Sequence, residues 1–183
     1  MKKVAVVLIM LGVSLLVYSL YQISESNLSQ QKALVKAEEL IATEEHPIFK
    51  KGQEIGVLEI PKLDRKLPII EGTDKEELAK GVGHYIGSAL PNQQNQIVLS
   101  GHRDTVFTGF DELENGDLFT VKMGYGTFTY KIVGTKIVDA EDRTVIRSTF
   151  PNEELIVTTC YPFEYIGNAP KRYIITAKRA NSP

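Results

Sequence analysis

The chain has 183 residues and a formal net charge of −2 at neutral pH, with 21 Lys and Arg residues against 23 Asp and Glu residues. This balance excludes the strongly basic surface on which nucleic-acid binding depends, so we expect no nucleic-acid partner. The single cysteine, Cys160, excludes a disulfide within the chain. The core therefore has to stabilise the fold without a covalent cross-link.

An uncharged, mostly apolar run covers residues 4–23, directly after Lys2 and Lys3. A helix of these 20 residues would be about 30 Å long, which is the thickness of the hydrocarbon core of a bilayer. Because the positive charges precede the run and Glu25 follows it, the positive-inside rule predicts an extracytoplasmic location for the rest of the chain. We interpret residues 1–23 as a cytoplasmic stub and a transmembrane anchor.

The alternative for this run is a cleaved signal peptide. The apolar part of such a peptide is usually about 7 to 15 residues long and is followed by small residues at the cleavage site. The run in this chain is longer, and the sequence SLYQISES at its end offers no clear site of that kind. Both criteria favour an uncleaved anchor.

Residues 24–51 are predicted to form a juxtamembrane helical stalk and linker. Pro47 is expected to end the helix, and the neighbouring His46 to be a solvated residue. The expected role of the segment is that of a spacer between the membrane and the following domain. Apolar residues recur at helical spacing along it, among Lys, Gln and Glu: Leu34, Ala37, Leu40 and Ile41.

From residue 52 the hydrophobic pattern changes to that of β-strands. One helix is indicated, where residues 73–76 form a capping-box pattern and Gly81 ends the segment. Seven or so short strands with one short helix predict a mainly β domain, a closed antiparallel or mixed barrel, over residues 52–183. The predicted strands are rich in β-branched and aromatic residues: GVLEIPKL, LPII, IVLSGH, DLFTVKM, TFTYKIVGTKIV, ELIVTTC and RYIITAK.

Cys160 ends the predicted strand ELIVTTC. A free thiol is only a few per cent thiolate at neutral pH, so a nucleophilic cysteine needs a basic or cationic partner. His102 directly follows the apolar strand IVLSGH, and loops that leave strands commonly present catalytic side chains. His84 lies between the predicted helix and the next strand, and we interpret it as a structural residue that forms hydrogen bonds in a turn.

Arg172, at the start of RYIITAK, is the candidate for stabilising an oxyanion. If this strand pairs antiparallel with the strand that ends at Cys160, the thiol and the guanidinium lie at facing ends of neighbouring strands. Arginine is always charged and carries several donors, which suits a carbonyl oxygen that becomes negative. Arg103, Lys171 and Arg179 are expected to be surface residues in ion pairs. From the residues alone, a catalytic and a structural role for Cys160 both stay open.

At these residues the chain resembles the sortases, and most closely the class D sortases. The segment IVLSGHRDTVF resembles the one that carries the sortase histidine, and IVTTC resembles the family's T-L-x-T-C motif. CYPFEYIGNAPKRY resembles the class D continuation from the cysteine to the arginine. The likeness extends over residues 52–178, and the upstream segments GVLEIPKL, LPIIEGT, GVGHYIGSALP and NGDLFTV follow the same order.

The resemblance implies a closed eight-stranded β-barrel with one or two short helices, and a cysteine transpeptidase on the outer face of a Gram-positive membrane. It implies that Cys160 attacks the Thr carbonyl of an LPxTG or LPxTA sorting signal, that His102 protonates the leaving amine, and that Arg172 stabilises the oxyanion. Thr159 would orient the bound signal; the alternative is a β-branched strand residue. The acyl group would pass to an amine of a peptidoglycan precursor, which anchors secreted proteins that bear the signal.

The same comparison bears on metals and on rival functions. The segment GSALPNQQNQ before the histidine strand has no carboxylate, whereas some class A sortases bind calcium there, so we predict no metal and no other cofactor. The chain has no Asp-Pro dipeptide and no second hydrophobic segment, which favours wall anchoring over the pilin polymerisation of class C sortases. A non-catalytic module that binds a wall peptide, and a hydrolytic enzyme, remain alternatives. We expect a monomer.

Overall fold

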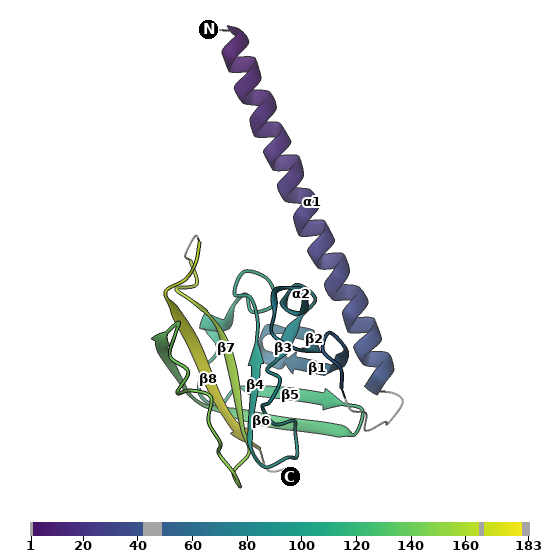
Figure 1. Ribbon diagram of the computed structural model, residues 1–183, viewed down its shortest axis with the longest axis vertical. Helices are drawn as coiled ribbons and strands as arrows, with labels where there is room; N and C mark the ends of the chain where they lie inside the picture. Colours follow the sequence, from purple (N-terminus) through teal and green to yellow (C-terminus); the bar gives the residue numbers. More distant parts are fainter. Residues whose placement is uncertain (1, 42–48, 165–166, 181–183) are drawn as a thin grey trace.

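The computed structural model describes residues 2–41, 49–164 and 167–180. A long helix, α1 (Lys2–Ile41), precedes a closed β-barrel that also contains one short helix, α2 (Lys75–Leu78), as Figure 1 shows. The predicted mainly β barrel is confirmed. Its eight strands are β1 (Glu54–Ile60), β2 (Arg65–Glu71), β3 (Val82–His84), β4 (Gln96–Ser100), β5 (Leu118–Met123), β6 (Gly126–Asp139), β7 (Glu154–Tyr161) and β8 (Lys171–Arg179).

The strands follow one another around the barrel in the order β1-β2-β3-β4-β7-β8-β6-β5, and β5 pairs with β1 to close it. The pairs β2–β3 and β4–β7 are parallel, and the other neighbours are antiparallel. In the β4–β7 pair, Ser100 lies beside Thr158. Because these two strands run in the same direction, the loop that follows β4 and the end of β7 meet at the same end of the barrel.

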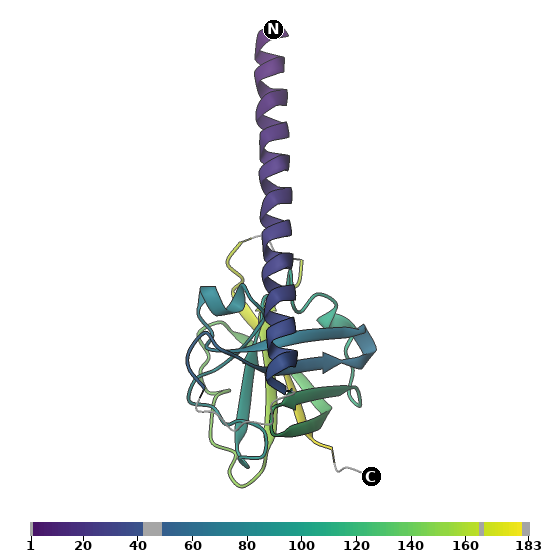
Figure 2. The same cartoon turned by 90° about the vertical axis from the view of Figure 1, so that its right-hand side faces the viewer.

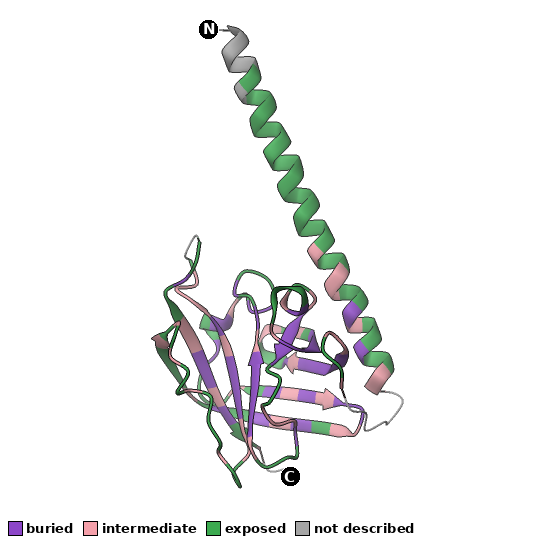
Figure 3. Ribbon diagram, in the orientation of Figure 1, coloured by how far each residue is buried: buried purple, intermediate pink, exposed green. Residues whose placement is uncertain are grey.

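Strands β4, β7 and β8 have apolar residues on both faces. Inside the barrel, Leu155 and Val157 of β7 belong to the main core together with Phe107, Phe110 and Tyr130. On the outer face, a second buried cluster joins one residue from each of the three strands. Val138 of β6 and Val145 of the β6–β7 connection pack against it. Figure 3 shows the buried stretches along these strands. The outer cluster consists of Val98, Ile156 and Ile174.

Helix α1 continues without interruption from the predicted anchor into the predicted stalk and ends at Ile41. Ala33 and Ala37 are buried where its C-terminal part packs on β1 and β2, and Lys36 Nζ lies 2.6 Å from the carboxylate of Glu54. Figures 1 and 2 show that this contact is on the side of the barrel away from β7 and β8. Within the described part of the chain, no helix has the length and apolar character needed to cross a membrane. His46 and Pro47 lie outside the described residues.

The capping box of α2 is one residue further along than the sequence pattern indicated. Asp74 is the N-cap, and its backbone N–H donates to the carboxylate of Glu77 over 3.2 Å. The pattern Thr73 to Glu76 had the same spacing, so the sequence offered two overlapping boxes. Thr73 precedes the N-cap residue, and it lines a hollow on the outer face of the barrel.

Gly56 allows β1 and β5 to approach each other closely. A Cβ atom at this position would lie 2.4 Å from the carbonyl oxygen of Lys122 and 2.7 Å from Sδ of Met123. We predict that Gly56→Ala lowers the free energy of unfolding by about 1 to 3 kcal/mol, because the backbone of the neighbouring strand would have to shift. Denaturant titration of the full chain measures this change.

Gly134 in β6 provides the matched control. A Cβ atom there meets nothing within 4 Å, so Gly134→Ala should change the free energy of unfolding by no more than about 0.5 kcal/mol. Equal stability of the two variants would contradict the proposed close approach.

Candidate active site

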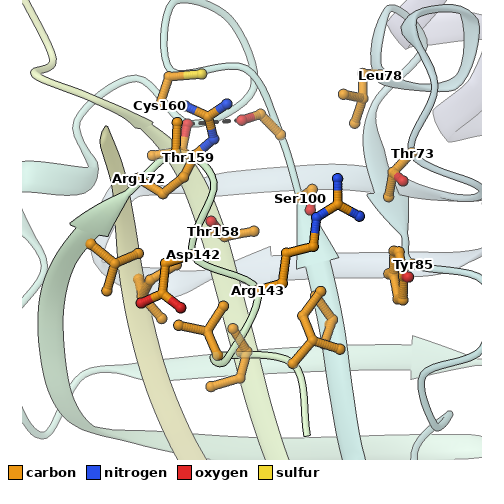
Figure 4. Close-up of a pocket in the computed structure, with 18 of the residues that line it drawn as sticks. Thr73, Leu78, Tyr85, Ser100, Asp142, Arg143, Thr158, Thr159, Cys160 and Arg172 are labelled. Carbon is orange, nitrogen blue, oxygen red and sulfur yellow. Dashed lines mark hydrogen bonds between the residues drawn. The ribbon is translucent and has the colours of Figure 1, made fainter. Parts of the chain in front are cut away.

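A hollow of about 650 Å³ lies on the outer face of the barrel. The outer faces of β4, β7 and β8 form its floor, with the apolar cluster of Val98, Ile156 and Ile174 beneath. Residues of the β6–β7 connection line it, as do Thr73, Leu78 and Tyr85 (Figure 4). We call this hollow the groove. It contains all four residues that the sequence put forward: His102, Thr159, Cys160 and Arg172.

Cys160 lies directly opposite Arg172 in the antiparallel β7–β8 pair. The antiparallel pairing that the sequence argument required is therefore present, and directly opposite residues of such a pair are about 5 Å apart. Cys160 is half-buried and is a free cysteine. In Figure 4 the guanidinium of Arg172 extends beside the cysteine at one end of the groove. The thiol is thus accessible and next to a permanent positive charge.

The Arg172 side chain is fixed by backbone carbonyls of its own segment. Its Nη1 donates to the carbonyl oxygen of Ala169 over 3.1 Å and to that of Lys171 over 3.0 Å. Within the described residues no hydrogen bond is made by Nε or Nη2. The guanidinium is therefore held in place by one nitrogen and can donate through the others to a developing oxyanion.

His102 is exposed on the loop that leaves β4. The backbone on either side of it is fixed: the N–H of Gly101 donates to the carbonyl of Thr158 over 3.2 Å, and the N–H of Phe107 donates to the carbonyl of His102 over 3.0 Å. A solvent-exposed ring on a fixed backbone can exchange protons with a ligand in the groove and with water. The structure thus brings the predicted base, nucleophile and cation together.

Thr159 has its side chain on the opposite face of β7 from Cys160 and is buried. Its hydroxyl donates to the carbonyl of Gly101 over 2.8 Å. Because the hydroxyl proton is used in this bond, we interpret Thr159 as a residue that positions the His102 loop. The contact of Thr159 with a bound signal stays a prediction.

The environment of Arg103 differs from the one predicted. The residue was expected on the surface, but it is buried and donates to the carbonyl oxygens of Pro162, over 3.0 Å, and Gly167, over 3.4 Å. It also contacts the exposed carboxylate of Asp104 at 3.3 Å. Arg103 therefore ties the His102 loop to the connection between Cys160 and Arg172. Its position next to His102 was the available signal.

An aromatic cluster supports the first part of the β7–β8 connection. The rings of Tyr161 and Phe163 are 5.6 Å apart, and the ring of Tyr173 lies 5.1 Å from that of Phe163. Phe163 and Tyr173 pack against the main core. The sequence YPF after Cys160 thus anchors the connection on the end of the barrel.

His84 has the structural role predicted for it. It is buried, with Nδ1 2.7 Å from the carboxylate of Glu71 and Nε2 3.0 Å from the carbonyl oxygen of Ala89. Nε2 also lies 3.0 Å from the hydroxyl oxygen of Ser88, so the ring is held on both sides by hydrogen-bonding groups. The residue that follows, Tyr85, lines the groove.

The charged side chains that line the groove are mainly cationic. Arg143 and Arg172 face it together with His102, and Asp142 is the one carboxylate among its described lining residues. Hydrogen bonds from the hydroxyl and the backbone N–H of Thr144 lower the pKa of Asp142. No group of three or more potential metal ligands occurs among the described residues; the absence of a required metal stays a prediction.

The family model of the sortase domain matches residues 58–180. The chain belongs to the sortase family. Sortase D of Bacillus subtilis (strain 168) is 60% identical over 128 residues, which are 70% of this chain and 65% of that protein. Sortase SrtE1 of Streptomyces coelicolor is 32% identical over 132 residues, which are 62% of this chain and 38% of that protein. This sortase therefore spans less than two thirds of the length of either relative.

Solved structures agree with this assignment. The catalytic domain of SrtD from B. anthracis is 42% identical, with a TM-score of 0.62 over 75% of this chain and 94% of that one. A sortase D5 transpeptidase from Clostridium perfringens has a TM-score of 0.73 at 23% identity, over 84% and 99% of the two chains. The second likeness supports the sortase fold alone, and the first supports the similarity to class D.

The bond from Thr159 to Gly101 makes a testable contribution to stability. We predict that Thr159→Val lowers the free energy of unfolding by about 1 to 3 kcal/mol, because a buried carbonyl loses its donor. Thr159→Ser keeps the hydroxyl and should recover most of that loss. Denaturant titrations of both variants measure the effect, and a Val variant as stable as the Ser variant would contradict the role assigned to this bond.

Proposed function

We propose that this sortase is a membrane-anchored, extracytoplasmic cysteine transpeptidase. It cleaves an LPxT-type sorting signal after Thr and transfers the acyl group to an amine of the cell wall, which anchors surface proteins. The observation that carries the proposal is the placement of Cys160 directly opposite Arg172, with His102 lining the same groove. A structural thiol needs neither a facing guanidinium nor an open groove.

The chemistry follows from the positions of the three side chains. The Cys160 thiolate attacks the Thr carbonyl carbon, a C–S bond forms, and the electron pair of the carbonyl moves to its oxygen. The guanidinium of Arg172 stabilises that charge. When the intermediate collapses, the C–N bond breaks and His102 gives a proton to the leaving amine. The incoming amine then loses a proton to His102 as it displaces the thiol from the thioester.

The groove suits an extended peptide whose first residues, Leu and Pro of the signal, are apolar. Its floor is formed by the parallel β4–β7 pair and by β8, and Ile156 and Ile174 lie under it. Leu and Pro of the signal would bury apolar surface on this floor, while the Thr carbonyl lies at the Cys160 end. Polar contacts from Ser100 and Thr158, which also line the groove, are available to the peptide backbone.

The membrane anchor is supported by the apolar run at residues 4–23 and by the continuity of α1 from this run to the barrel. Ala33 and Ala37 are buried against the barrel, so the helix is fixed to the domain. In Figures 1 and 2 the β7–β8 connection lies at the end of the barrel toward which the N-terminal half of α1 extends. An anchored helix would thus turn the Cys160 end of the groove toward the membrane, where a newly secreted protein emerges.

Two other functions remain to be tested against this one. A binding module would use the same groove without needing a reactive thiol, and a hydrolase would form the same acyl enzyme but pass it to water. A thiol-reactive probe that a sorting-signal peptide blocks supports the enzyme over the binding module. Faster loss of the acyl enzyme in the presence of an amine, with the amide as product, supports transfer over hydrolysis.

Mass spectrometry of the full chain in mild detergent tests the proposed function. LPxTG and LPxTA peptides are each incubated with the protein, with and without an amine acceptor. We expect a thioacyl adduct on Cys160 that ends at Thr, and its conversion to an amide when the amine is present. No adduct with either peptide would reject the proposed activity.

Replacing Cys160 by Ala removes the nucleophile. We predict that the variant has no measurable turnover of either peptide and no adduct, while its circular dichroism stays that of the wild type. Substitution at a half-buried strand end leaves the core unchanged, so loss of activity reports on chemistry. Residual turnover in this variant would show that another group forms the intermediate.

Replacing Arg172 by Lys keeps the charge but removes the planar set of donors. We predict a fall in kcat of about a hundredfold, because one ammonium cannot both hold the carbonyl contacts and reach the oxyanion. Lys171→Arg, at the exposed neighbouring position, is the matched control and should have a near-normal rate. A near-normal rate for Arg172→Lys would mean that other donors hold the oxyanion.

A further inference from the structure

The turn that follows β3 places apolar side chains in water at the edge of the groove. Tyr85 lines the groove and is 38% exposed, and the adjacent Ile86 is 51% exposed. In Figure 4 Tyr85 and Thr73 lie at the side of the groove away from Arg172. Because aromatic side chains that line an open groove are typical of ligand contacts, the position of the Tyr85 ring matters for binding.

The backbone of Tyr85 is held on both sides. Its N–H donates to the carbonyl of Val98 over 2.9 Å, and its carbonyl accepts from the N–H of Ser88 over 2.9 Å. The hydroxyl of Ser88 donates to the same carbonyl over 2.9 Å and accepts from the N–H of Val98 over 3.2 Å. Ser88 therefore joins Tyr85 to Val98, which also lines the groove.

His84 supports the hydroxyl of Ser88 from the buried side of this turn. The imidazole is buried, with Nε2 3.0 Å from that hydroxyl oxygen and Nδ1 2.7 Å from the carboxylate of Glu71. Glu71 and His84 lie beside each other in the parallel β2–β3 pair. A buried ring that is held at both nitrogens keeps one orientation, so it connects the barrel to the turn that carries Tyr85.

We propose that His84, acting through Ser88, positions Tyr85 as the wall of the groove against which the bound peptide packs. The inference rests on the proposed function and assigns positioning roles to two residues that do not themselves line the groove. A wall that is ordered before binding loses little conformational entropy when the peptide arrives. The effect belongs in KM, because the wall contacts the substrate and the transition state alike.

The alternative is that His84 only provides a partner for the buried carboxylate of Glu71. The two contacts of the ring can be separated by substitution. Asn carries its amide group near the position of Nδ1, and Gln carries its amide group near the position of Nε2. His84→Asn therefore keeps the contact with Glu71, whereas His84→Gln keeps the contact with Ser88.

Kinetics and urea unfolding of the full chain in mild detergent test the proposal. They use whichever of the LPxTG and LPxTA peptides forms the adduct. We expect His84→Asn to raise KM about tenfold, with kcat within about twofold of the wild type. His84→Gln should show the reverse, with a near-normal KM and a lower urea midpoint, because Glu71 loses its partner. Ser88→Ala should raise KM as His84→Asn does.

A double-mutant cycle identifies the Tyr85 ring as the group that is positioned. Tyr85→Ala should raise KM by about the same factor as Ser88→Ala, and the double variant should show no further rise, because the turn then has no ring to place. Ile146→Ala is the matched control. Ile146 is 39% exposed and lines the groove, but it lies outside this turn, so its effect should multiply with that of Ser88→Ala.

The possible failures are distinguishable. A wild-type KM for Ser88→Ala, independent effects of Tyr85→Ala and Ser88→Ala, or an equal rise in KM for the Asn and Gln variants of His84 would overturn the positioning role, while turnover itself upholds the proposed function. Gly56→Ala lowers stability far from the turn, and a raised KM in that variant would mean that KM follows stability alone. If the wild type forms no adduct on Cys160, the proposed function fails and this inference fails with it.

Discussion

The register of three neighbouring strands is the constraint on which the site depends. β7 pairs with β4 on one side, where Ser100 lies beside Thr158, and with β8 on the other, where Cys160 lies opposite Arg172. Side chains alternate between the two faces of a strand, so a shift of β7 by one residue would turn the side chain of Cys160 into the barrel and the side chain of Thr159 to the outer face. The outer apolar cluster opposes such a shift, because it needs Ile156 on the same face as Cys160.

Buried contacts then couple the loops that carry the reactive groups. Thr159 bonds to Gly101, and Arg103 bonds to Pro162 beyond Cys160. Each bond joins the His102 loop to β7 or to the segment that follows it. His102 itself is exposed, as proton transfer requires, but the backbone that carries it is anchored in buried structure. An exposed ring on a rigid support combines access to a ligand with a defined position.

The sequence predicted the parts of the fold that depend on local pattern. Alternating, β-branched segments located the strands that carry Cys160 and Arg172, and the antiparallel pairing on which their proximity depended is present in the structure. Two features depend on contacts between distant residues, and no local pattern could reveal them: the parallel pairing of the three-residue strand β3 with β2, and the position of Arg143 across the groove. The resemblance to sortases supplied the eighth strand, because the residues alone indicated about seven.

The residues that line the groove lie on two kinds of structure, paired strands and a connection between strands. Cys160 and Arg172 lie on hydrogen-bonded strands, where the ladder fixes their separation, and catalysis depends on such fixed distances. Arg143 lies on a connection whose own turns shape it, and a connection can change its side chains without altering the register of the barrel. A substitution in the β6–β7 connection therefore leaves the pairing of Cys160 with Arg172 in place. Val145 packs on the outer apolar cluster, and this contact holds the β6–β7 connection beside the groove.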